Sequence, residues 1–212
     1  MTMTRLARTE RHALCDLALE LGEDAPTLSG DWTVKELVVH LLIREGSPAA
    51  IGITVPPLAR VTDLASRQLA KTDHAVLVER LRKGPPLYSP FRIAAMDKTL
   101  NTLEFFVHHE DIRRAQPGWE PRELDTRVQD VLWKMIRVGG RGLVRGAAVG
   151  VTLERGDTRE QAVLKDSSTP VVVRGLPSEL VMFVYGRQEQ SRVELDGSPS
   201  DIARLTGADL GI

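Results

Sequence analysis

The chain has 212 residues, enough for one large domain or two small ones, and its 42% hydrophobic and 27% charged content is ordinary for a globular protein. A net charge of −1 without a basic run gives no reason to expect a nucleic-acid partner, and no apolar run approaches the roughly 20 residues that a membrane-spanning helix needs. The single cysteine excludes an internal disulfide and a cysteine-based zinc cluster, and the charged N-terminus lacks a signal-peptide core, so we expect a cytoplasmic protein.

Two helices are predicted before residue 47. The first carries leucines at helical spacing, ends at Gly22, and surrounds Cys15 with leucines, which indicates a buried, inert thiol. The second begins at Thr33 with Glu36 three residues later, the capping-box pattern, and stops before Pro48.

The next hundred residues also read as largely helical. Residues 53–61 and 84–91 are predicted loops. Asp73 is a predicted N-cap, and Gly139-Gly140 is predicted to interrupt or loosen the last helix of this region. The helices are expected over residues 63–71, 73–84, 93–115 and 125–144.

The character of the sequence changes after Gly146. Short β-branched runs predict strands at residues 149–155, 161–166, 170–175 and 192–197, and helices are expected over 175–187 and 198–207. We therefore predict an α+β fold, with an all-helical domain over residues 1–146 and a small α/β domain over residues 147–212.

The helix predicted over residues 93–115 carries an unusual polar stripe. With Glu104 at zero on a helical wheel, His108 lies about 40° to one side and Asp111 about 20° to the other, between apolar shoulders. Asp97 and Asn101 fall in the same sector. The opposite face is predicted to meet solvent; its residues are Lys98, Thr102, Phe106, His109, Glu110 and Arg113.

Buried carboxylates need cations, hydrogen-bond donors or a metal, so two interpretations remain open. Glu104 and Asp111 could pair with arginines in a structural network. Alternatively, Glu104 and His108 could be metal ligands one helical turn apart, with Asp111 accepting the other ring N–H of a histidine ligand. A third ligand would have to come from another helix. Helical periodicity does not settle whether His40 faces the same site.

Two motifs together resemble a known family. In DWTVKELVVHL, His40 follows Trp32 by eight residues, which resembles the metal-binding N-terminal domain of the mycothiol-dependent maleylpyruvate isomerase family. That domain belongs to the DinB-like four-helix-bundle superfamily, and a later helix of the family carries Glu-x3-His-x2-Asp, matched here by Glu104, His108 and Asp111. The resemblance covers residues 1 to about 145, and the C-terminal region also resembles the family's second domain.

The resemblance implies a DinB-like four-helix bundle that binds a divalent metal, expected to be zinc, through His40, Glu104 and His108. It also implies an open fourth position at which the metal activates a low-molecular-weight thiol such as mycothiol. The implied activity is that of an isomerase or S-transferase acting on a small molecule. Arg44 and Arg187 are candidate cationic side chains for an anionic substrate.

Three functions therefore remain open at this stage. The first is a metal- and thiol-dependent isomerase or transferase. The second is a metal-binding or sensor module of the same fold without catalysis. The third is a helical scaffold in which the polar stripe is only a buried network, and this one predicts no bound metal.

Overall fold

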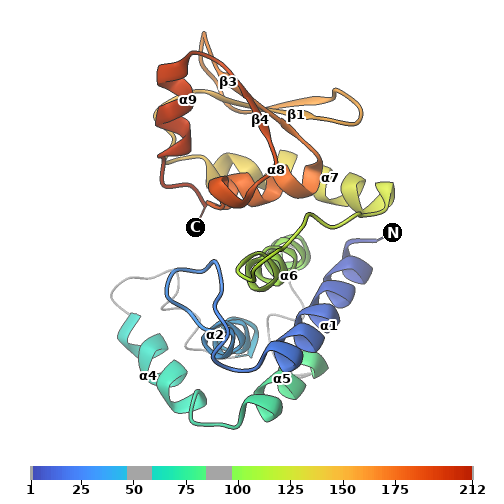
Figure 1. Ribbon diagram of the computed structural model, residues 1–212, viewed down its shortest axis with the longest axis vertical. Helices are drawn as coiled ribbons and strands as arrows, with labels where there is room; N and C mark the ends of the chain where they lie inside the picture. The colour runs from blue at the N-terminus through green and yellow to red at the C-terminus, as the bar shows by residue number, and fades with distance from the viewer. Residues whose placement is uncertain (1, 47–58, 85–96, 212) are drawn as a thin grey trace. The chain divides into compact units, whose positions relative to one another are not determined.

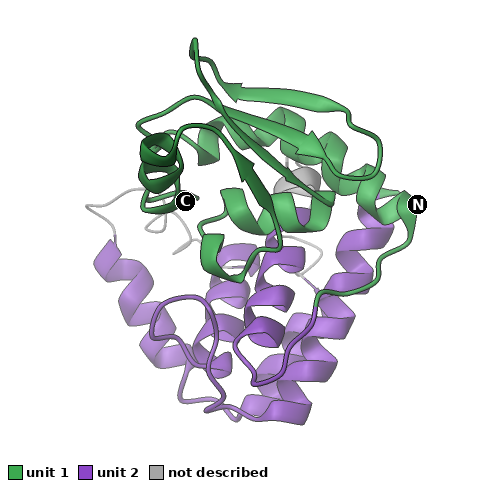
Figure 2. Cartoon of the chain, turned by 45° about the horizontal axis from the view of Figure 1, so that its top comes forward, with its two compact units in different colours: residues 1–2, 121–212 green, residues 3–120 purple. Residues whose placement is uncertain are grey.

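The computed structural model describes residues 2–46, 59–84 and 97–211 (Figure 1). These residues form α-helices and one four-stranded sheet, which confirms the predicted α+β class. The chain divides into two compact units: residues 3–120, and residues 1–2 with 121–212 (Figure 2). We call them the helical unit and the sheet unit. None of the described helices combines the length and apolar character needed to cross a bilayer.

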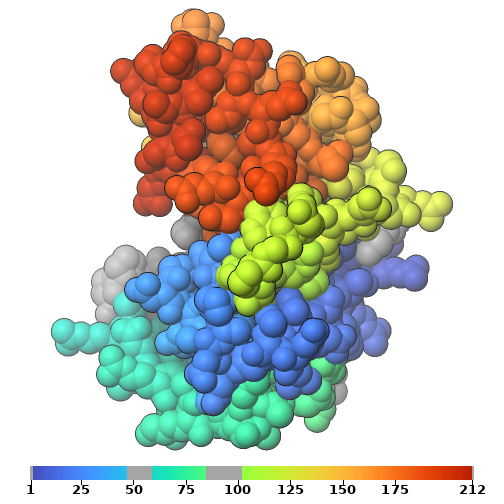
Figure 3. All heavy atoms as spheres, viewed as in Figure 1, coloured from blue at the N-terminus to red at the C-terminus, as the bar shows by residue number. Residues whose placement is uncertain are grey.

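The helical unit holds five described helices around one apolar core. The core takes buried side chains mainly from α1, α2 and α5, with Phe105 and Ile112 from α6. By contrast, α4 contains no buried residue and lies at the surface of the unit, in the turquoise region of Figure 3. The helices are α1 (Met3–Leu21), α2 (Val34–Gly46), α4 (Ala59–Leu69), α5 (His74–Lys83) and α6 (Asp97–Arg114).

Local capping signals set the helix ends as predicted. The Thr33 backbone N–H donates to Glu36 Oε2 (2.8 Å) and the Glu36 N–H donates to Thr33 Oγ1 (3.4 Å), the reciprocal bonds of a capping box. Asp73 accepts from the Val76 N–H and caps α5. Gly22 follows α1 with a φ of 85°, which a residue with a Cβ adopts only at a cost. Residues 53–58 and 85–91 of the predicted loops lie outside the described residues, whereas residues 59–61, also predicted as loop, form the first turn of α4.

The predicted solvent face of α6 is wrong, because α1 packs along it. His109 is only 6% exposed, and its Nδ1 donates to Glu10 Oε2 of α1 at 2.8 Å. Thr102 is fully buried and donates to the Met3 carbonyl (3.3 Å). Phe106 and Glu110 are buried as well. Lys98, like the stripe residues Asp97 and Asn101, lies in the part of α6 whose side chains are outside the described set.

The sheet unit is built on a mixed sheet of order β2-β1-β3-β4. β1 and β3 pair in parallel, while β2 and β4 add antiparallel edges, and the buried residues of β1 and β3 supply most of the sheet's apolar contribution to the core. The elements are α7 (Thr126–Leu143), β1 (Val151–Arg155), β2 (Gln161–Lys165), β3 (Val171–Gly175), α8 (Pro177–Val184), a 3₁₀ turn (Gln188–Gln190), β4 (Glu194–Asp196) and α9 (Pro199–Thr206).

The expected interruption at Gly139-Gly140 is also wrong, because α7 runs through both residues without a break. Gly140 has a packing reason instead: a Cβ there would come within 2.9 Å of a methyl group of Leu164 on β2. The glycine allows α7 to lie close to the sheet. Since α7 packs on α8 and β2, the division between the compact units falls at residues 120 and 121. The domain boundary near residue 147 stays a prediction.

Candidate metal centre

Three candidate ligands from two helices converge in the helical unit. Glu104 Oε1 on α6 lies 3.7 Å from His40 Nε2 on α2 and 3.6 Å from His108 Nε2, one turn along α6. The ligand atoms of the three residues all lie within 4.8 Å of one another. The structure therefore places His40 beside the Glu104–His108 pair, the point that helical periodicity left open.

Trp32 adds an aromatic wall next to this cluster. Its ring centroid lies 4.9 Å from that of His40, with the planes inclined at 43°. The His40 ring in turn meets the His108 ring nearly edge-on, at a centroid distance of 5.5 Å. Trp32 comes from the loop that ends at the capping box of α2, whereas His40 lies on the helix itself.

Asp111 orients His108 from the side opposite Glu104. His108 Nδ1 donates to Asp111 Oδ2 (2.9 Å), which leaves the Nε2 lone pair facing Glu104, as a metal ligand requires. Ser29 Oγ donates to the same Asp111 oxygen (2.9 Å), and the Leu28 N–H donates to the Asp111 carbonyl (3.2 Å). Asp111 is fully buried. Sequence reasoning missed Ser29, because it lies in a loop where no spacing rule applies.

The two candidate arginines differ in position. Arg44, one turn after His40 on α2, places Nη2 3.0 Å from Glu104 Oε2. Arg44 thus contacts the three-ligand cluster through Glu104. Arg187 belongs to the sheet unit, where its guanidinium donates to the Tyr185 carbonyl and its backbone N–H to the Met182 carbonyl (3.0 Å).

Burial and charge act on the protonation of the cluster in opposite directions. Burial raises the pKa of Glu104, but the facing His108 and His40 rings and the charge of Arg44 outweigh it and hold that pKa well below its usual range. Burial lowers the pKa of His108. Its hydrogen bond to Asp111 and its proximity to Glu104 raise the same pKa by more than burial lowers it, so the net shift is upward. The lowered pKa favours the carboxylate form of Glu104 at neutral pH, which is the form that binds a cation.

Two other histidines and Cys15 lie outside the cluster and have other contacts. His74 Nε2 donates to the Ala18 carbonyl (2.9 Å), and His109 is held by Glu10 as described above. Cys15 is fully buried, as predicted, and burial raises the pKa of its thiol to about 12, which favours the neutral thiol over the reactive thiolate. Among the side chains that the structure describes, one group of three possible metal ligands converges. It consists of His40, Glu104 and His108.

The donor set and its spacing fit a divalent ion such as zinc. Imidazole nitrogen and carboxylate oxygen are common zinc ligands. Two bonds of about 2.0–2.1 Å at a tetrahedral angle separate their ligand atoms by roughly 3.4 Å, close to the 3.6 and 3.7 Å seen here. These separations are too long for hydrogen bonds between the side chains and suit an ion between them.

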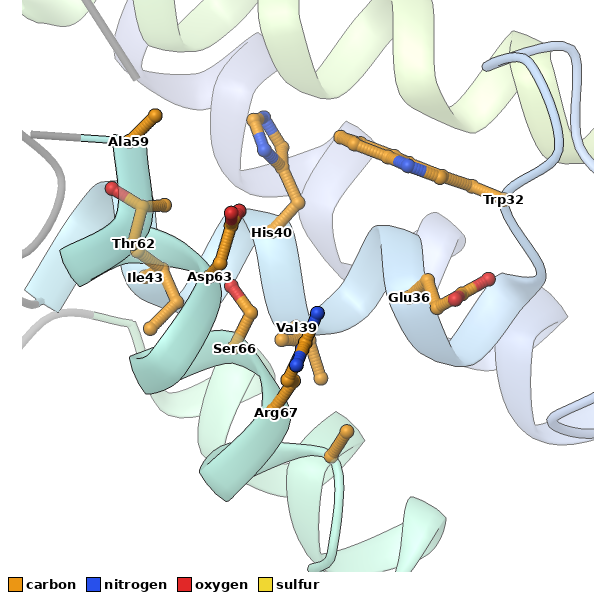
Figure 4. A pocket seen from close by; sticks show the side chains of 11 residues that line it. Trp32, Glu36, Val39, His40, Ile43, Ala59, Thr62, Asp63, Ser66 and Arg67 are labelled. Carbon is orange, nitrogen blue, oxygen red and sulfur yellow. The ribbon is translucent and has the colours of Figure 1, made fainter. Parts of the chain in front are cut away.

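A cavity of about 400 Å³ lies beside the cluster, between α2 and α4. His40 is the residue that the cavity and the three-ligand cluster share. Figure 4 shows Asp63 and Ser66 of α4 beside α2, with His40 above Asp63 and Trp32 further along the same side of the cavity, which Thr62 also lines. The cavity thus combines an aromatic side chain and several polar groups next to a candidate metal ligand, as small-molecule sites commonly do.

Two solved structures share this fold. A crystal structure of the mycothiol-dependent maleylpyruvate isomerase aligns with a TM-score of 0.56 at 16% identity, covering 92% of this chain and 91% of that one. A histidine-to-alanine mutant of that isomerase aligns with a TM-score of 0.58 at 15% identity and the same coverage. No protein-family model matches the chain, and no curated protein matches it. At such low identity, the likeness establishes the fold alone.

Proposed function

We propose that this protein binds one divalent metal ion, zinc, at His40, Glu104 and His108, and uses it in a reaction that depends on a low-molecular-weight thiol. The observation that carries the proposal is the convergence of three ligand atoms from α2 and α6 at the spacing of a metal site. The shared fold with a mycothiol-dependent isomerase supports mycothiol as the thiol and isomerisation as the first reaction to test, with S-transfer as the alternative chemistry.

Each residue of the cluster has a separate task in this proposal. His40, Glu104 and His108 hold the ion, and Asp111, fixed by Ser29, keeps His108 in the tautomer whose Nε2 is free to bind. When bound, the ion would lower the pKa of a thiol so that the thiolate is available at neutral pH. In the isomerisation, the thiolate adds to a conjugated cis double bond, the resulting single bond rotates, and the thiolate leaves. The negative charge passes to the enolate of the substrate when the C–S bond forms. It returns to the thiolate when the enolate collapses, re-forms the double bond in the trans configuration and breaks the C–S bond.

The cavity beside His40 favours this catalytic function over a non-catalytic metal module. A structural zinc site is closed by four protein ligands, whereas a catalytic one keeps a position for substrate. In the described parts of the chain the cluster contributes three ligands. The cavity of about 400 Å³ reaches one of them and provides room for a small molecule.

Elemental analysis tests the metal part of the proposal. Purified protein, incubated with zinc and desalted, should hold about one ion per chain, and Glu104→Ala should hold none. His12→Ala is the matched control, because His12 belongs to the same unit but not to the cluster. If the protein holds no zinc under these conditions, the polar stripe is better explained as a structural network without a metal.

A turnover assay tests the chemistry separately. Zinc-loaded protein, mycothiol and maleylpyruvate should give the trans isomer, observed by proton NMR, and omission of either zinc or thiol should stop the reaction. His108→Ala should be inactive. Stoichiometric zinc without thiol-dependent turnover of maleylpyruvate or of related unsaturated acids would instead support the non-catalytic metal module.

A further inference from the structure

The two oxygens of Glu104 are divided between different partners. Oε1 faces His40 and His108 at 3.7 and 3.6 Å, whereas Oε2 lies 3.0 Å from Nη2 of Arg44. A carboxylate whose second oxygen is held by a guanidinium presents one oxygen, and not both, to an ion between the histidines. The division therefore bears on how many positions around the ion the protein occupies.

The position of Arg44 follows from the helix that carries His40. The two residues are four apart on α2, so their side chains project from the same face towards α6. The side chain of Arg44 is 20% exposed and that of Glu104 is 14% exposed. An ion pair at this depth is less screened by solvent than an exposed surface pair. Arg44 therefore lies within the cluster and is not a solvated surface residue.

Arg44 also changes the charge balance of the site. A divalent ion, Glu104 and Asp111 sum to zero, because the two carboxylates cancel the ion. The guanidinium of Arg44 makes the sum +1. For the ion, Glu104, Asp111 and Arg44 taken together, the arrival of a thiolate brings the sum of charges to zero. Without Arg44 the same sum would be −1 in a partly buried place.

We propose that Arg44 is a positioning residue that holds Glu104 as a one-oxygen ligand, keeps a coordination position open, and supplies the positive charge that favours an anionic thiolate. This inference rests on the proposed metal site and goes beyond it. Arg44 would account both for the open coordination position on the ion and for the preference of the site for an anionic thiolate. An arginine that only neutralises a buried carboxylate would account for neither.

The test uses cobalt(II) as the metal and 2-mercaptoethanol as the thiol. Visible absorption of cobalt(II) reports coordination number, since four-coordinate sites absorb more strongly than five-coordinate ones, and a sulfur-to-cobalt charge-transfer band reports thiolate binding. Arg44→Met should keep one cobalt per chain, lose visible intensity as Glu104 binds through both oxygens, and bind the thiol about 10- to 100-fold more weakly.

Two further variants separate orientation from charge. Arg44→Gln can still donate to Oε2 but is neutral, so it should keep the wild-type visible intensity and lose thiol affinity. Arg44→Lys keeps the charge and should retain most of the thiol affinity. If Arg44→Met does not fold, this pair carries the test. Arg80→Met, at an exposed arginine of α5, is the control and should match the wild type.

The outcomes distinguish this inference from the proposed function. Wild-type protein that takes up no cobalt would overturn both. Wild-type protein that binds cobalt and thiol, together with Arg44 variants whose spectra and thiol affinities match those of Arg80→Met, would overturn only the role of Arg44. The proposed metal site would then be retained, and Arg44 would only neutralise the charge of Glu104.

Discussion

His108 and His109 are adjacent in the chain, and each donates through Nδ1 to a buried carboxylate. The partner of His108 is Asp111 on the same helix, and the partner of His109 is Glu10 on α1. The difference lies at the other ring nitrogen, because only His108 directs Nε2 at the ligand cluster. His108 thus faces the candidate metal centre, and His109 links α6 to α1.

Substitution should separate these two roles. His108→Ala should abolish zinc binding, whereas His109→Ala should retain one zinc per chain and lower the free energy of unfolding by about 1–3 kcal/mol, because Glu10 loses a buried hydrogen-bond donor. Elemental analysis and urea unfolding of zinc-free protein measure the two effects. Loss of zinc in His109→Ala with retention in His108→Ala would mean that the cluster has been assigned to the wrong histidine.

Much of the cluster was predictable from spacing within one helix. Glu104, His108 and Asp111 lie within two turns of α6, so helical geometry alone places them on one face. His40 came only from the resemblance, since the helix around it is apolar on nearly every side. Ser29 and Trp32 could not be predicted to touch the site, because each comes from a loop whose path depends on tertiary packing.

At the scale of elements, the strand predictions and the caps of α2 and α5 were confirmed because they depend on residues a few positions apart. The loop predicted through residue 61 was wrong at its end, since α4 begins at residue 59. Two other errors concern neighbours distant in sequence. The outer face of α6 is polar yet covered by α1, and the Gly139-Gly140 pair, which looks like a helix break, accommodates Leu164 of β2. The sequence of α6 does not indicate that α1 packs on it, and the sequence of α7 does not indicate the contact with Leu164.

The sheet carries a charge network that should make its stability depend on pH. Glu154 on β1 accepts from Arg174 of β3 (2.6 Å), from Arg159 (2.7 Å) and from Gln161 of β2 (2.8 Å). The bonds from Gln161, Arg159 and Arg174 lower the pKa of Glu154 from an ordinary value near 4.5 to about 2. Its stabilising contribution is therefore complete above pH 4.5 and is lost as the pH falls towards 2.

Glu154→Gln should remove this dependence. The variant should unfold at a lower urea concentration than the wild type at pH 7, and the difference should shrink as the pH falls from 4.5 to about 2. Urea unfolding followed by circular dichroism across this pH range measures the effect. Glu194→Gln is the control, since that exposed carboxylate holds only one of the arginines. A difference that is constant with pH would exclude the linkage.

At the scale of the whole molecule, the candidate metal centre lies entirely within the helical unit. His40, Glu104, His108, Asp111 and Arg44 all fall between residues 3 and 120. The described residues that line the cavity beside His40 also belong to this unit. Metal binding should therefore stabilise one unit more than the other.

Hydrogen exchange can localise that stabilisation. Zinc at 100 times its dissociation constant should stabilise the native state by roughly 2.7 kcal/mol, equivalent to about 100-fold slower exchange through opening of the site. Amides of α2 and α6 should gain more protection than those of β1 and β3, and a chelator should reverse the gain. Equal protection of both units, or none in either, would contradict a metal site confined to α2 and α6.

The contact between Trp32 and His40 makes the site optically visible without any label. The chain contains three tryptophans, and Trp32 is the one whose indole packs against a candidate ligand of the cluster, His40, with 38% of its surface open to solvent. Its emission therefore senses both the charge of the adjacent imidazole and the polarity of the cavity. A fluorescence titration of Trp119→Phe/Trp133→Phe protein follows occupation of the site in real time, at concentrations far below those that elemental analysis or absorption requires.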